Sequence, residues 1–288
     1  MFDYVEKRIN ENMTQHTTLH IGGNARWFLL PKNDEELLRI IWDCKQSGID
    51  FFVLGNGSNL LVSDQGFAGA VISMEKFNKI EKKGDNLIEV EAGVNLFELN
   101  RFCYENSLGG LEWSFGIPAS IGGATKTNCG AFGGEFCKHI KNITVFDGIR
   151  IKKRKKIKYA YRKGCLRNNE ILIAVTLALE RLDAQKIKEK QNEFFTIRKE
   201  KQPYGKFSLG SVFKRGEGFL PAKIIDEMGL KGMREGDLIV SEKHAGFIVN
   251  LGKGLASDFL KLVEKIEHDA LKKGYKFQRE FVCLGFDK

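Results

Sequence analysis

The chain has 288 residues, of which 42% are hydrophobic, and 46 Lys and Arg against 37 Asp and Glu give it a formal charge of +9. This length and apolar content are those of a folded protein and suffice for one large or two to three modest buried cores. No run reaches the roughly 18 to 20 apolar residues that span a bilayer, and the N-terminal stretch MFDYVEKRINEN lacks the apolar core of a secretory signal. We therefore expect a cytoplasmic protein with no membrane partner.

The surplus of positive charge admits nucleic acid, a membrane surface or a small anionic ligand as partner. Its densest run, IKKRKKIKYAYRKG at residues 151–164, is broken by Ile157, Tyr159 and Tyr161, and this alternation predicts a strand with a solvated lysine face. No zinc-finger, RNP-like or helix-turn-helix pattern accompanies it, so we expect no nucleic-acid partner. The six cysteines lack C-x-x-C or His/Cys spacing, which predicts reduced thiols and no metal site.

In chain order, helices and strands are predicted to alternate irregularly through the first 180 residues or so. A helix is predicted after a cap at Asn33 or Asp34, with an apolar series that reaches Trp42 and with Gly48 just past its end. A second helix is predicted over residues 96–106. Strands are predicted over residues 51–54, 87–90, 143–146 and 171–179.

The last third of the chain has a pattern of its own. A charged, helix-prone stretch closes at Gln202-Pro203 and predicts a connector between domains. Beyond it, Pro221 starts a predicted short helix that ends at Gly229, and Ser257 is the predicted cap of a helix reaching Lys273. Strands are predicted near Ile239 and over residues 246–251 and 276–285. These elements indicate a compact α+β unit.

Two glycine-rich segments are candidates for binding a ligand. In LGNGSNLLVSDQGF, residues 54–67, Asn56-Gly57 is typical of a hairpin turn. Alternatively, the successive backbone N–H groups of residues 55–59 form a nest suited to a diphosphate. The second segment, GIPASIGGATKTNCGAFGG at residues 116–134, has six glycines, which suits a backbone that something approaches closely. Neither segment fits G-x-G-x-x-G or the P-loop, but together they indicate a long phosphate-bearing cofactor.

Further motifs now add a family resemblance. They are HTTLHIGGNA (16–25), YAYRKG (159–164), GSVFKR (210–215), AKIIDEMGLKG (222–232) and SEKHAGFIVN (241–250). With the glycine segments they make nearly the whole chain resemble the UDP-N-acetylenolpyruvoylglucosamine reductase (MurB) family, and its type II branch in particular. The resemblance implies an α+β protein with the FAD-binding fold of the vanillyl-alcohol oxidase (PCMH) type. The implied domains are FAD-binding subdomains at residues 1–75 and 76–182, a connector helix at 183–203 and a substrate-binding domain at 204–288, whose final strand could return to the active site.

The resemblance also implies an activity. The expected protein is an NADPH-dependent flavoenzyme that reduces UDP-N-acetyl-3-O-(1-carboxyvinyl)glucosamine to UDP-N-acetylmuramate in peptidoglycan precursor synthesis. Its cofactor would be FAD and its co-substrate NADPH, with hydride passing through the flavin to C3 of the enolpyruvyl group and a proton added at C2. We expect a monomer.

Site residues follow from motif position. The resemblance assigns the substrate carboxylate to Arg162, proton donation to Ser211, and assistance to both steps to Glu280. This suits the chemistry, because charge that develops on a carboxylate needs a fixed cation and C2 needs an acid. The expected cofactor-binding residues are Gly55, Asn56, Gly57, Ser58, Asn59, Leu60, Gly116, Ile117, Pro118, Ser120, Ile121, Gly122, Gly123 and Gly130. The expected substrate-binding residues are Tyr161, Lys214 and Arg215.

The chain departs from the family pattern close to Arg162 and around Glu280. Gly164 stands where the family usually has serine, and Arg279-Glu280-Phe281 stands where it usually has Pro-Glu-Val. Two other functions remain open on the sequence. One is another FAD-dependent oxidoreductase on the same fold, and the other is a basic binding protein without catalysis.

Overall fold

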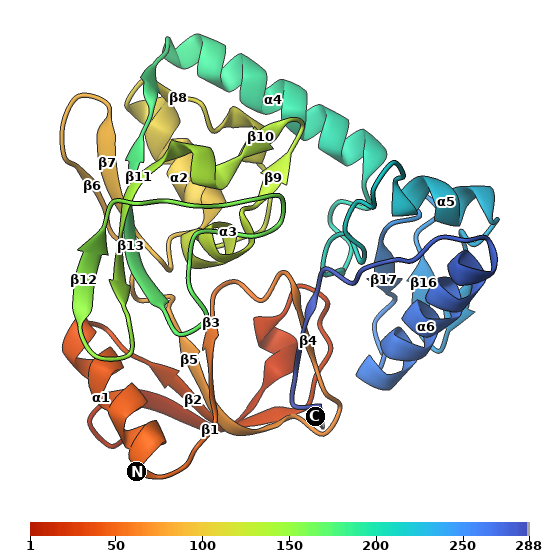
Figure 1. Ribbon diagram of the computed structural model, residues 1–288, viewed down its shortest axis with the longest axis horizontal. Helices are drawn as coiled ribbons and strands as arrows, with labels where there is room; N and C mark the ends of the chain where they lie inside the picture. Colours follow the sequence, from red (N-terminus) through yellow and green to blue (C-terminus); the bar gives the residue numbers. More distant parts are fainter. Residues whose placement is uncertain (287–288) are drawn as a thin grey trace. The chain divides into compact units, whose positions relative to one another are not determined.

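The computed structural model describes residues 1–286 (Figure 1). The chain forms two compact units, and each draws on separate segments of the sequence. Unit one comprises residues 1–7, 29–56 and 71–198. Unit two comprises residues 8–28, 57–70 and the chain from residue 199 onward.

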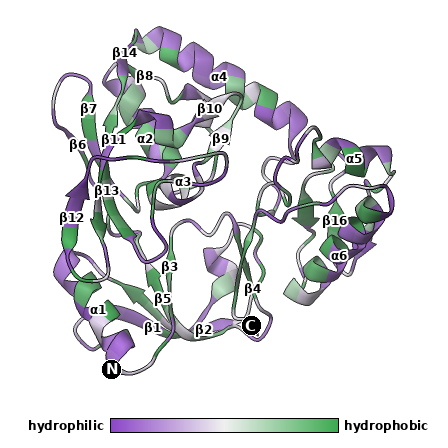
Figure 2. Ribbon diagram, in the orientation of Figure 1, coloured by the Kyte–Doolittle hydropathy of each residue, from purple (hydrophilic) through white to green (hydrophobic). Residues whose placement is uncertain are grey.

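Unit one is built on a five-stranded antiparallel sheet in the order β12-β11-β13-β7-β6. Its strands are β6 (Ile80–Lys82), β7 (Leu87–Glu91), β11 (Ile140–Phe146), β12 (Ile151–Arg154) and β13 (Ile171–Ala178). The central strand β13 is buried from Leu172 to Leu177, which accounts for the hydrophobic colour it shows in Figure 2. The strands predicted near residues 87–90, 143–146 and 171–179 are thus confirmed.

Four helices begin in unit one. They are α1 (Asp34–Gln46), α2 (Leu96–Glu105), α3 (Ile121–Thr127) and α4 (Ala184–Lys201). The cap predicted for α1 is confirmed, because the side chain of Asn33 accepts a hydrogen bond from Glu36 N at 2.9 Å. Trp42 was expected on the apolar face of α1 but is 61% exposed, since the buried stripe continues to Cys44 instead. Helix α3 packs against β7 and β13.

A second sheet has the strand order β1-β2-β5-β3. Its strands are β1 (Glu6–Asn12), β2 (Asn24–Leu30), β3 (Phe51–Leu54) and β5 (Phe67–Ser73), of which only β3 was predicted. Strand β4 (Leu60–Val62) instead pairs in parallel with β18 (Val282–Leu284). Because β3 and β4 belong to different sheets, Asn56-Gly57 is not the turn of a hairpin, and that interpretation is wrong.

Unit two has a core between helices and a short sheet. Helix α5 (Pro221–Glu227) begins with proline at its first position, as predicted, and packs on α6 (Ala256–Lys272). The antiparallel sheet β15-β16-β17 comprises β15 (Arg234–Glu235), β16 (Leu238–Val240) and β17 (Ile248–Asn250). Buried side chains of α6, including Phe259 and Leu262, join those of this sheet in one hydrophobic cluster.

The N-terminus of α6 is capped from a distant part of the sequence. The predicted cap at Ser257 is wrong, because the helix begins at Ala256 and its N-cap position, Leu255, has no capping side chain. The carboxylate of Asp64 accepts instead, from Ala256 N at 2.7 Å and from Ser257 N at 3.0 Å. An acidic group at this end also suits the helix dipole.

The remaining elements are short. They are β8 (Leu108–Gly109) paired with β14 (Glu180–Arg181), β9 (Gly130–Ala131) paired with β10 (Gly134–Glu135), and the 3-10 helices η1 (Met13–His16), η2 (Glu112–Ser114) and η3 (Phe136–His139). The final strand predicted over residues 276–285 is regular only in β18. Before it, the chain runs beside residues 211–214 with irregular pairing.

The basic run also differs from its prediction. Only residues 151–154 form a strand, β12, and residues 155–169 form a long loop before Glu170 and β13. The reason is a turn at Tyr161-Arg162, where Ala160 and Lys163 pair with each other through two backbone hydrogen bonds of 2.8 and 3.0 Å. None of the helices within residues 1–286 is long and apolar enough to cross a membrane.

Candidate active site

The loop of residues 55–59 offers a row of backbone donors. Within residues 1–286, none of its five backbone N–H groups donates a hydrogen bond to another part of the chain. Gly55 and Asn56 are exposed. Successive N–H groups left without partners in an exposed loop can bind an anion such as a diphosphate.

In unit two, the loop rests on the segment that carries the HTTLHIGGNA motif. Gly57 has φ +60°, and a Cβ there would overlap the carbonyl oxygen of His16. Its own carbonyl oxygen accepts a hydrogen bond from Thr18 N at 3.3 Å. Only glycine meets both the left-handed φ and the close approach, so the motif residues shape the loop.

In unit one, the same loop is fixed to the second glycine segment. The Asn56 side chain donates from Nδ2 to the carbonyl oxygen of Pro118 at 2.7 Å. Gly55 lies so close to Ser120 that a Cβ at position 55 would overlap the serine hydroxyl. The structure therefore brings Gly55 and Asn56 together with residues 118–120, as the sequence predicts for one cofactor.

The backbone N–H groups at the start of α3 already donate hydrogen bonds within the chain. Ile121 N and Gly122 N donate to the carbonyl oxygens of Val94 and Ala92, both at 2.8 Å. Gly123 N donates to Oγ of Ser120, the N-cap residue, at 3.2 Å. These three amides already have acceptors within the chain.

Other glycines in residues 116–134 face side chains that leave no room for a Cβ. Gly116 has φ +84°, and a Cβ on it would lie 2.8 Å from the ring of Phe195. A Cβ on Gly134 would overlap the indole of Trp113. On Gly130, a Cβ would lie 2.6 Å from the carbonyl oxygen of Gly134 and 3.4 Å from a guanidinium nitrogen of Arg162. The glycines thus set the shape of a compact cradle.

Arg162 lies at the tip of the loop formed by residues 155–169. Its backbone takes φ +52°, a conformation that is uncommon for a residue with a side chain and is often found at functional sites. Its Nη1 donates to the carbonyl oxygen of Gly130 at 3.1 Å, which places the guanidinium beside the glycine segment. The exposed ring of Tyr161 lies 5.2 Å from the guanidinium carbon.

Asn128 is a residue that the sequence analysis missed. It is fully buried and left-handed, with φ +47°, at the C-terminus of α3. Its side chain donates to Ala160 O at 3.0 Å and to a carboxylate oxygen of Glu135 at 3.2 Å, and it accepts from Cys137 N at 3.1 Å. It therefore ties the glycine segment to the Arg162 turn, and an asparagine just past a short helix was its one signal.

Gly164 is held against the same helix. Its N–H donates to the carbonyl oxygen of Lys126 at 3.1 Å, and a Cβ on it would overlap the carbonyl oxygen of Thr125. The departure from the family serine is thus matched by a close backbone approach in this chain.

Ser211 and Glu280 lie on facing segments of unit two. Ser211 pairs with Phe247, and the carbonyl oxygen of Val212 accepts from Glu280 N at 2.8 Å. The Ser211 hydroxyl donates to Phe213 O at 3.2 Å, a weak contact that leaves it free to rotate. The side-chain amide of Asn59 donates to Glu280 O at 3.1 Å, so Glu280 adjoins the loop of residues 55–59.

The other candidates of unit two, Lys214 and Arg215, follow Ser211 in the sequence, and His244 lies before its partner Phe247. Lys214 N donates to Gln278 O at 2.9 Å, and Arg215 is exposed one residue further on. His244 accepts from Gly246 N through Nδ1 at 3.1 Å, and burial lowers its pKa below the ordinary value. This histidine shapes the turn that precedes Phe247, whose N–H donates to His244 O at 3.0 Å.

These features fit FAD. A loop with uncommitted donors suits the diphosphate, and the contacts of Gly55 and Asn56 hold residues 118–120 of the second glycine segment beside that loop. No group of three His, Cys, Asp or Glu in the described part of the chain could hold a metal ion. The six cysteines are free thiols.

Known protein families match most of the chain. Residues 25–148 match the family described as FAD binding domain. Residues 202–284 match the family described as UDP-N-acetylenolpyruvoylglucosamine reductase, C-terminal domain.

Full-length relatives agree with these matches. The UDP-N-acetylenolpyruvoylglucosamine reductase of Pseudothermotoga lettingae is 41% identical over 271 residues, which cover 92% of this chain and 93% of the relative. The crystal structure of that enzyme from Thermus caldophilus superposes with a TM-score of 0.84 at 34% identity and covers 97% of this chain and 98% of its own. A berberine bridge enzyme variant, at 16% identity and a TM-score of 0.51, shares the fold over 64% of this chain and 42% of its own. The expected α+β protein with the FAD-binding fold of the vanillyl-alcohol oxidase type is confirmed.

Proposed function

Because this chain belongs to the UDP-N-acetylenolpyruvoylglucosamine reductase family and is an FAD-dependent oxidoreductase, we propose that it reduces UDP-N-acetyl-3-O-(1-carboxyvinyl)glucosamine to UDP-N-acetylmuramate. The reductant is NADPH, and the product serves peptidoglycan synthesis. One geometric observation carries the assignment of the site. Asn59 of the cofactor loop bonds to Glu280, and Glu280 bonds in turn to the residue after Ser211.

Gly55, Asn56, Gly57, Ser58, Asn59 and Leu60 would hold the diphosphate end of FAD, and residues 116–123 with Gly130 would lie against its flavin and ribityl parts. When bound, FAD supplies a hydride that originates from NADPH and ends on C3 of the enolpyruvyl group.

Arg162 binds the substrate carboxylate. A guanidinium stays charged at any relevant pH, and its planar fork matches a carboxylate with two parallel hydrogen bonds. As negative charge spreads onto the carboxylate during hydride addition, a cation fixed in place beforehand stabilises that charge more than water does. Its bond to Gly130 and the strained turn at its backbone support this role, because both hold the side chain in one place.

Ser211 donates the proton to C2. Rotation of its hydroxyl away from Phe213 O frees the proton, and a basic enolate-like carbon is able to take it. Glu280 assists from the facing segment, and Lys214 and Arg215 provide cations for the phosphates of the nucleotide-linked substrates. Tyr161 lines the substrate-binding site beside Arg162.

We place the enzyme in the cytoplasm as a monomer without nucleic-acid or membrane partners. Free thiols are typical of a reducing compartment, and NADPH and nucleotide sugars are small soluble molecules that need no larger partner.

The test separates the two half-reactions. Ser211→Ala is expected to keep reduction of the flavin by NADPH and to lose turnover of the enolpyruvyl substrate, whereas Ser257→Ala, which removes an exposed hydroxyl, leaves both unchanged. Anaerobic flavin absorbance measures each step. Wild-type rates in both steps for Ser211→Ala would remove Ser211 from the mechanism.

A different FAD-dependent oxidoreductase on this fold would share the glycine segments and reduction by a nicotinamide. Substrate distinguishes the two, because only the proposed enzyme reoxidises its flavin with the enolpyruvyl UDP-sugar.

A further inference from the structure

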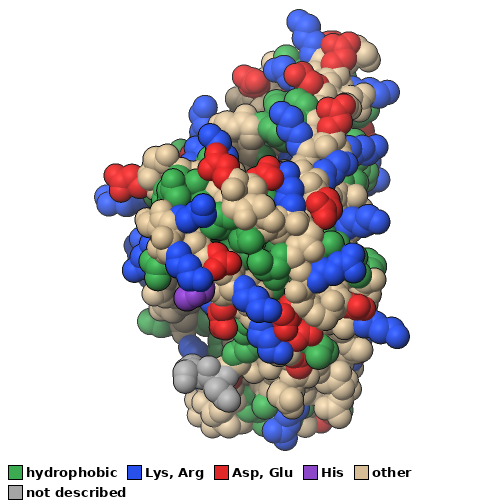
Figure 3. Space-filling view, turned by 90° about the vertical axis from the view of Figure 1, so that its right-hand side faces the viewer, with side chains coloured by type: hydrophobic (Ala, Val, Ile, Leu, Met, Phe, Trp, Pro, Cys, Tyr) green, Lys and Arg blue, Asp and Glu red, His purple; other side chains and the backbone are tan. Residues whose placement is uncertain are grey.

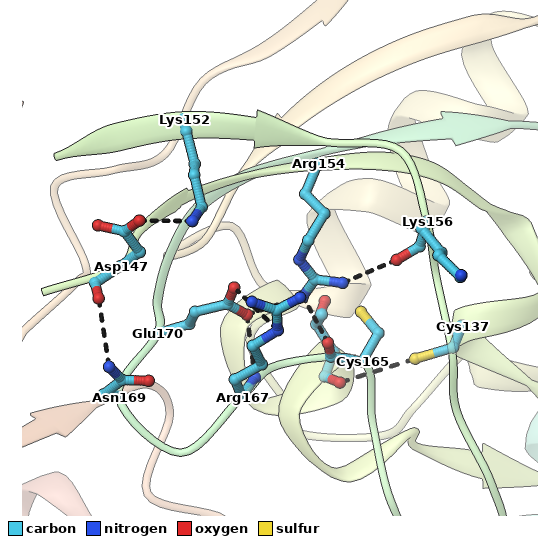
Figure 4. A network of polar contacts seen from close by, with 10 residues as sticks. Cys137, Asp147, Lys152, Arg154, Lys156, Cys165, Arg167, Asn169 and Glu170 are labelled. Carbon is cyan, nitrogen blue, oxygen red and sulfur yellow. Dashed lines mark hydrogen bonds and ion pairs between the residues drawn. The ribbon is translucent and has the colours of Figure 1, made fainter.

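The loop that carries Arg162 is closed at its base by one half-buried arginine. Arg154 is the last residue of β12, and Glu170 directly precedes β13, so the two residues flank the loop of residues 155–169. Figure 4 shows their side chains turned toward each other across the base of the loop, with Cys165 and Lys156 beside them.

Arg154 bonds to both limbs of the loop at once. Its Nη1 donates to the carbonyl oxygen of Lys156 at 2.8 Å on the outgoing limb. Its Nη2 donates to the carbonyl oxygen of Cys165 at 2.6 Å on the returning limb, and to Oε2 of Glu170 at 2.7 Å. One planar guanidinium therefore fixes the separation of the two limbs.

Glu170 completes the arrangement from the other side. Its side chain is only 1% exposed, and that of Arg154 is 14% exposed, so the ion pair is largely shielded from water. Glu170 Oε2 also accepts from Arg167 N at 2.9 Å, which fixes the returning limb a second time. A buried pair with this many bonds has a defined geometry, whereas exposed pairs usually exchange with water.

The base of the loop lies close to its tip along the returning limb. Only two residues separate Cys165 from Arg162, and between them Gly164 N is fixed to Lys126 O. On the outgoing side, Asn128 holds Ala160 O. A change in the spacing of the limbs at the base is thus transmitted to the turn in which Arg162 has its left-handed backbone.

We propose that Arg154 and Glu170 form a clasp that sets the position of Arg162 and are positioning residues for reduction of the enolpyruvyl substrate. The inference rests on the proposed function, since it takes Arg162 as the residue that binds the substrate carboxylate. Lysine cannot replace Arg154 in this role, because an ammonium is a single point charge and does not present the rigid fork that reaches three acceptors.

The experiment compares variants of the FAD-loaded enzyme. Arg154→Lys keeps the positive charge but removes the fork. Lys152→Met is the matched control, because Lys152 lies on the same strand and pairs with Asp147, away from the loop base. Arg162→Ala is the reference for complete loss of the carboxylate ligand.

For Arg154→Lys we expect reoxidation of the flavin by the enolpyruvyl substrate to slow by about tenfold, as small misplacements of a binding group do. Reduction by NADPH is expected to stay within about twofold of wild type, since Arg162 is not needed there. Trypsin cleavage after the exposed lysines of the loop, Lys155, Lys156, Lys158 and Lys163, is expected to become several-fold faster. Lys152→Met should change none of the three.

Two results would overturn the clasp. One is wild-type cleavage of the loop in Arg154→Lys, and the other is equal slowing of both half-reactions, which would indicate general damage to the fold. If Arg162→Ala itself leaves reoxidation intact, the proposed role of Arg162 fails, while the cleavage pattern still tests the clasp. Should Arg154→Lys not fold, Glu170→Gln serves instead. It keeps an acceptor oxygen but loses the charge, so the same changes are expected at smaller size.

Discussion

At Gly164, the absence of a side chain is required by neighbouring backbone. A Cβ there would overlap Thr125 O, while the residue's own N–H is bonded to Lys126. Family resemblance alone marks this position as a lost serine. Only the structure shows that α3 lies too close for one.

Gly164→Ser is therefore expected to lower the free energy of unfolding by about 1–3 kcal/mol, the usual range for overpacking against backbone that cannot move away. Urea unfolding measures it. Gly84→Ser is the control, because a Cβ at Gly84 meets only the Leu87 side chain at 3.8 Å. Equal stability of Gly164→Ser and wild type would show that α3 can shift.

His244 makes stability depend on pH in a defined direction. Burial lowers its pKa below the ordinary value of about 6.5, so the unfolded chain binds this proton more tightly than the folded one. Stability is fully present above the unfolded pKa and falls as pH drops toward the folded pKa.

His244→Asn keeps an acceptor for Gly246 N but cannot be protonated, so we expect it to flatten the loss of stability between about pH 7 and pH 5. Burial also lowers the pKa of His139, so some pH dependence should remain in the variant. Urea unfolding at several pH values tests this. Identical pH slopes for variant and wild type would contradict it.

Helices and strands whose own sequence contains a cap or an apolar stripe could be predicted. Features that depend on contacts with residues far away in the sequence could not. Helix α1 has its own asparagine cap and apolar stripe, and α5 has its own initial proline. By contrast, the pairing of β4 with β18 and the capping of α6 by Asp64 join residues about two hundred positions apart. The strand predicted over residues 151–164 is wrong beyond Arg154 for the same reason, because contacts with α3 set the course of the chain there.

The cap of α6 gives a test at this scale. Asp64→Ala is expected to lower the free energy of unfolding by roughly 0.5–2 kcal/mol, because two N–H groups lose their acceptor. Ser257→Ala should stay within about 0.5 kcal/mol of wild type, since its hydroxyl does not cap the helix. The reverse order of the two effects, measured by urea unfolding, would restore Ser257 as the cap.

For the molecule as a whole, the net charge of +9 is the balance of many basic and many acidic side chains. On the face drawn in Figure 3, Lys and Arg side chains are numerous, with Asp and Glu among them. The loop of residues 155–169, which carries Arg162, contains basic residues and no acidic ones. Among residues 1–286, the exposed Lys155, Lys156 and Lys158 have no acidic partner.

We therefore expect kcat/KM for the anionic substrate to fall as the salt concentration rises. Changing these three lysines to Gln is expected to lower kcat/KM roughly three- to tenfold at low ionic strength and to leave kcat unchanged. The matched control changes Lys186, Lys188 and Lys190 of α4 to Gln, which removes the same charge outside this loop. Equal effects of the two triple variants would assign the attraction to net charge alone.

Some residues of the candidate site could be proposed from the sequence, and others could not. The glycine segments could be identified because donor-rich, side-chain-poor sequence has few structural uses, and Arg162, Ser211 and Glu280 because they occupy family motifs. Asn128, Arg154 and Glu170 carry no such pattern. Their roles depend on hydrogen bonds to residues 11 to 32 positions away along the chain.

The most direct test of the account is the anaerobic visible absorption of the purified protein, first with NADPH and then with the enolpyruvyl UDP-sugar. We expect NADPH to bleach the flavin band and only this substrate to restore it. A band that bleaches and stays bleached after the substrate is added would contradict the proposed reaction while leaving the FAD-binding fold intact.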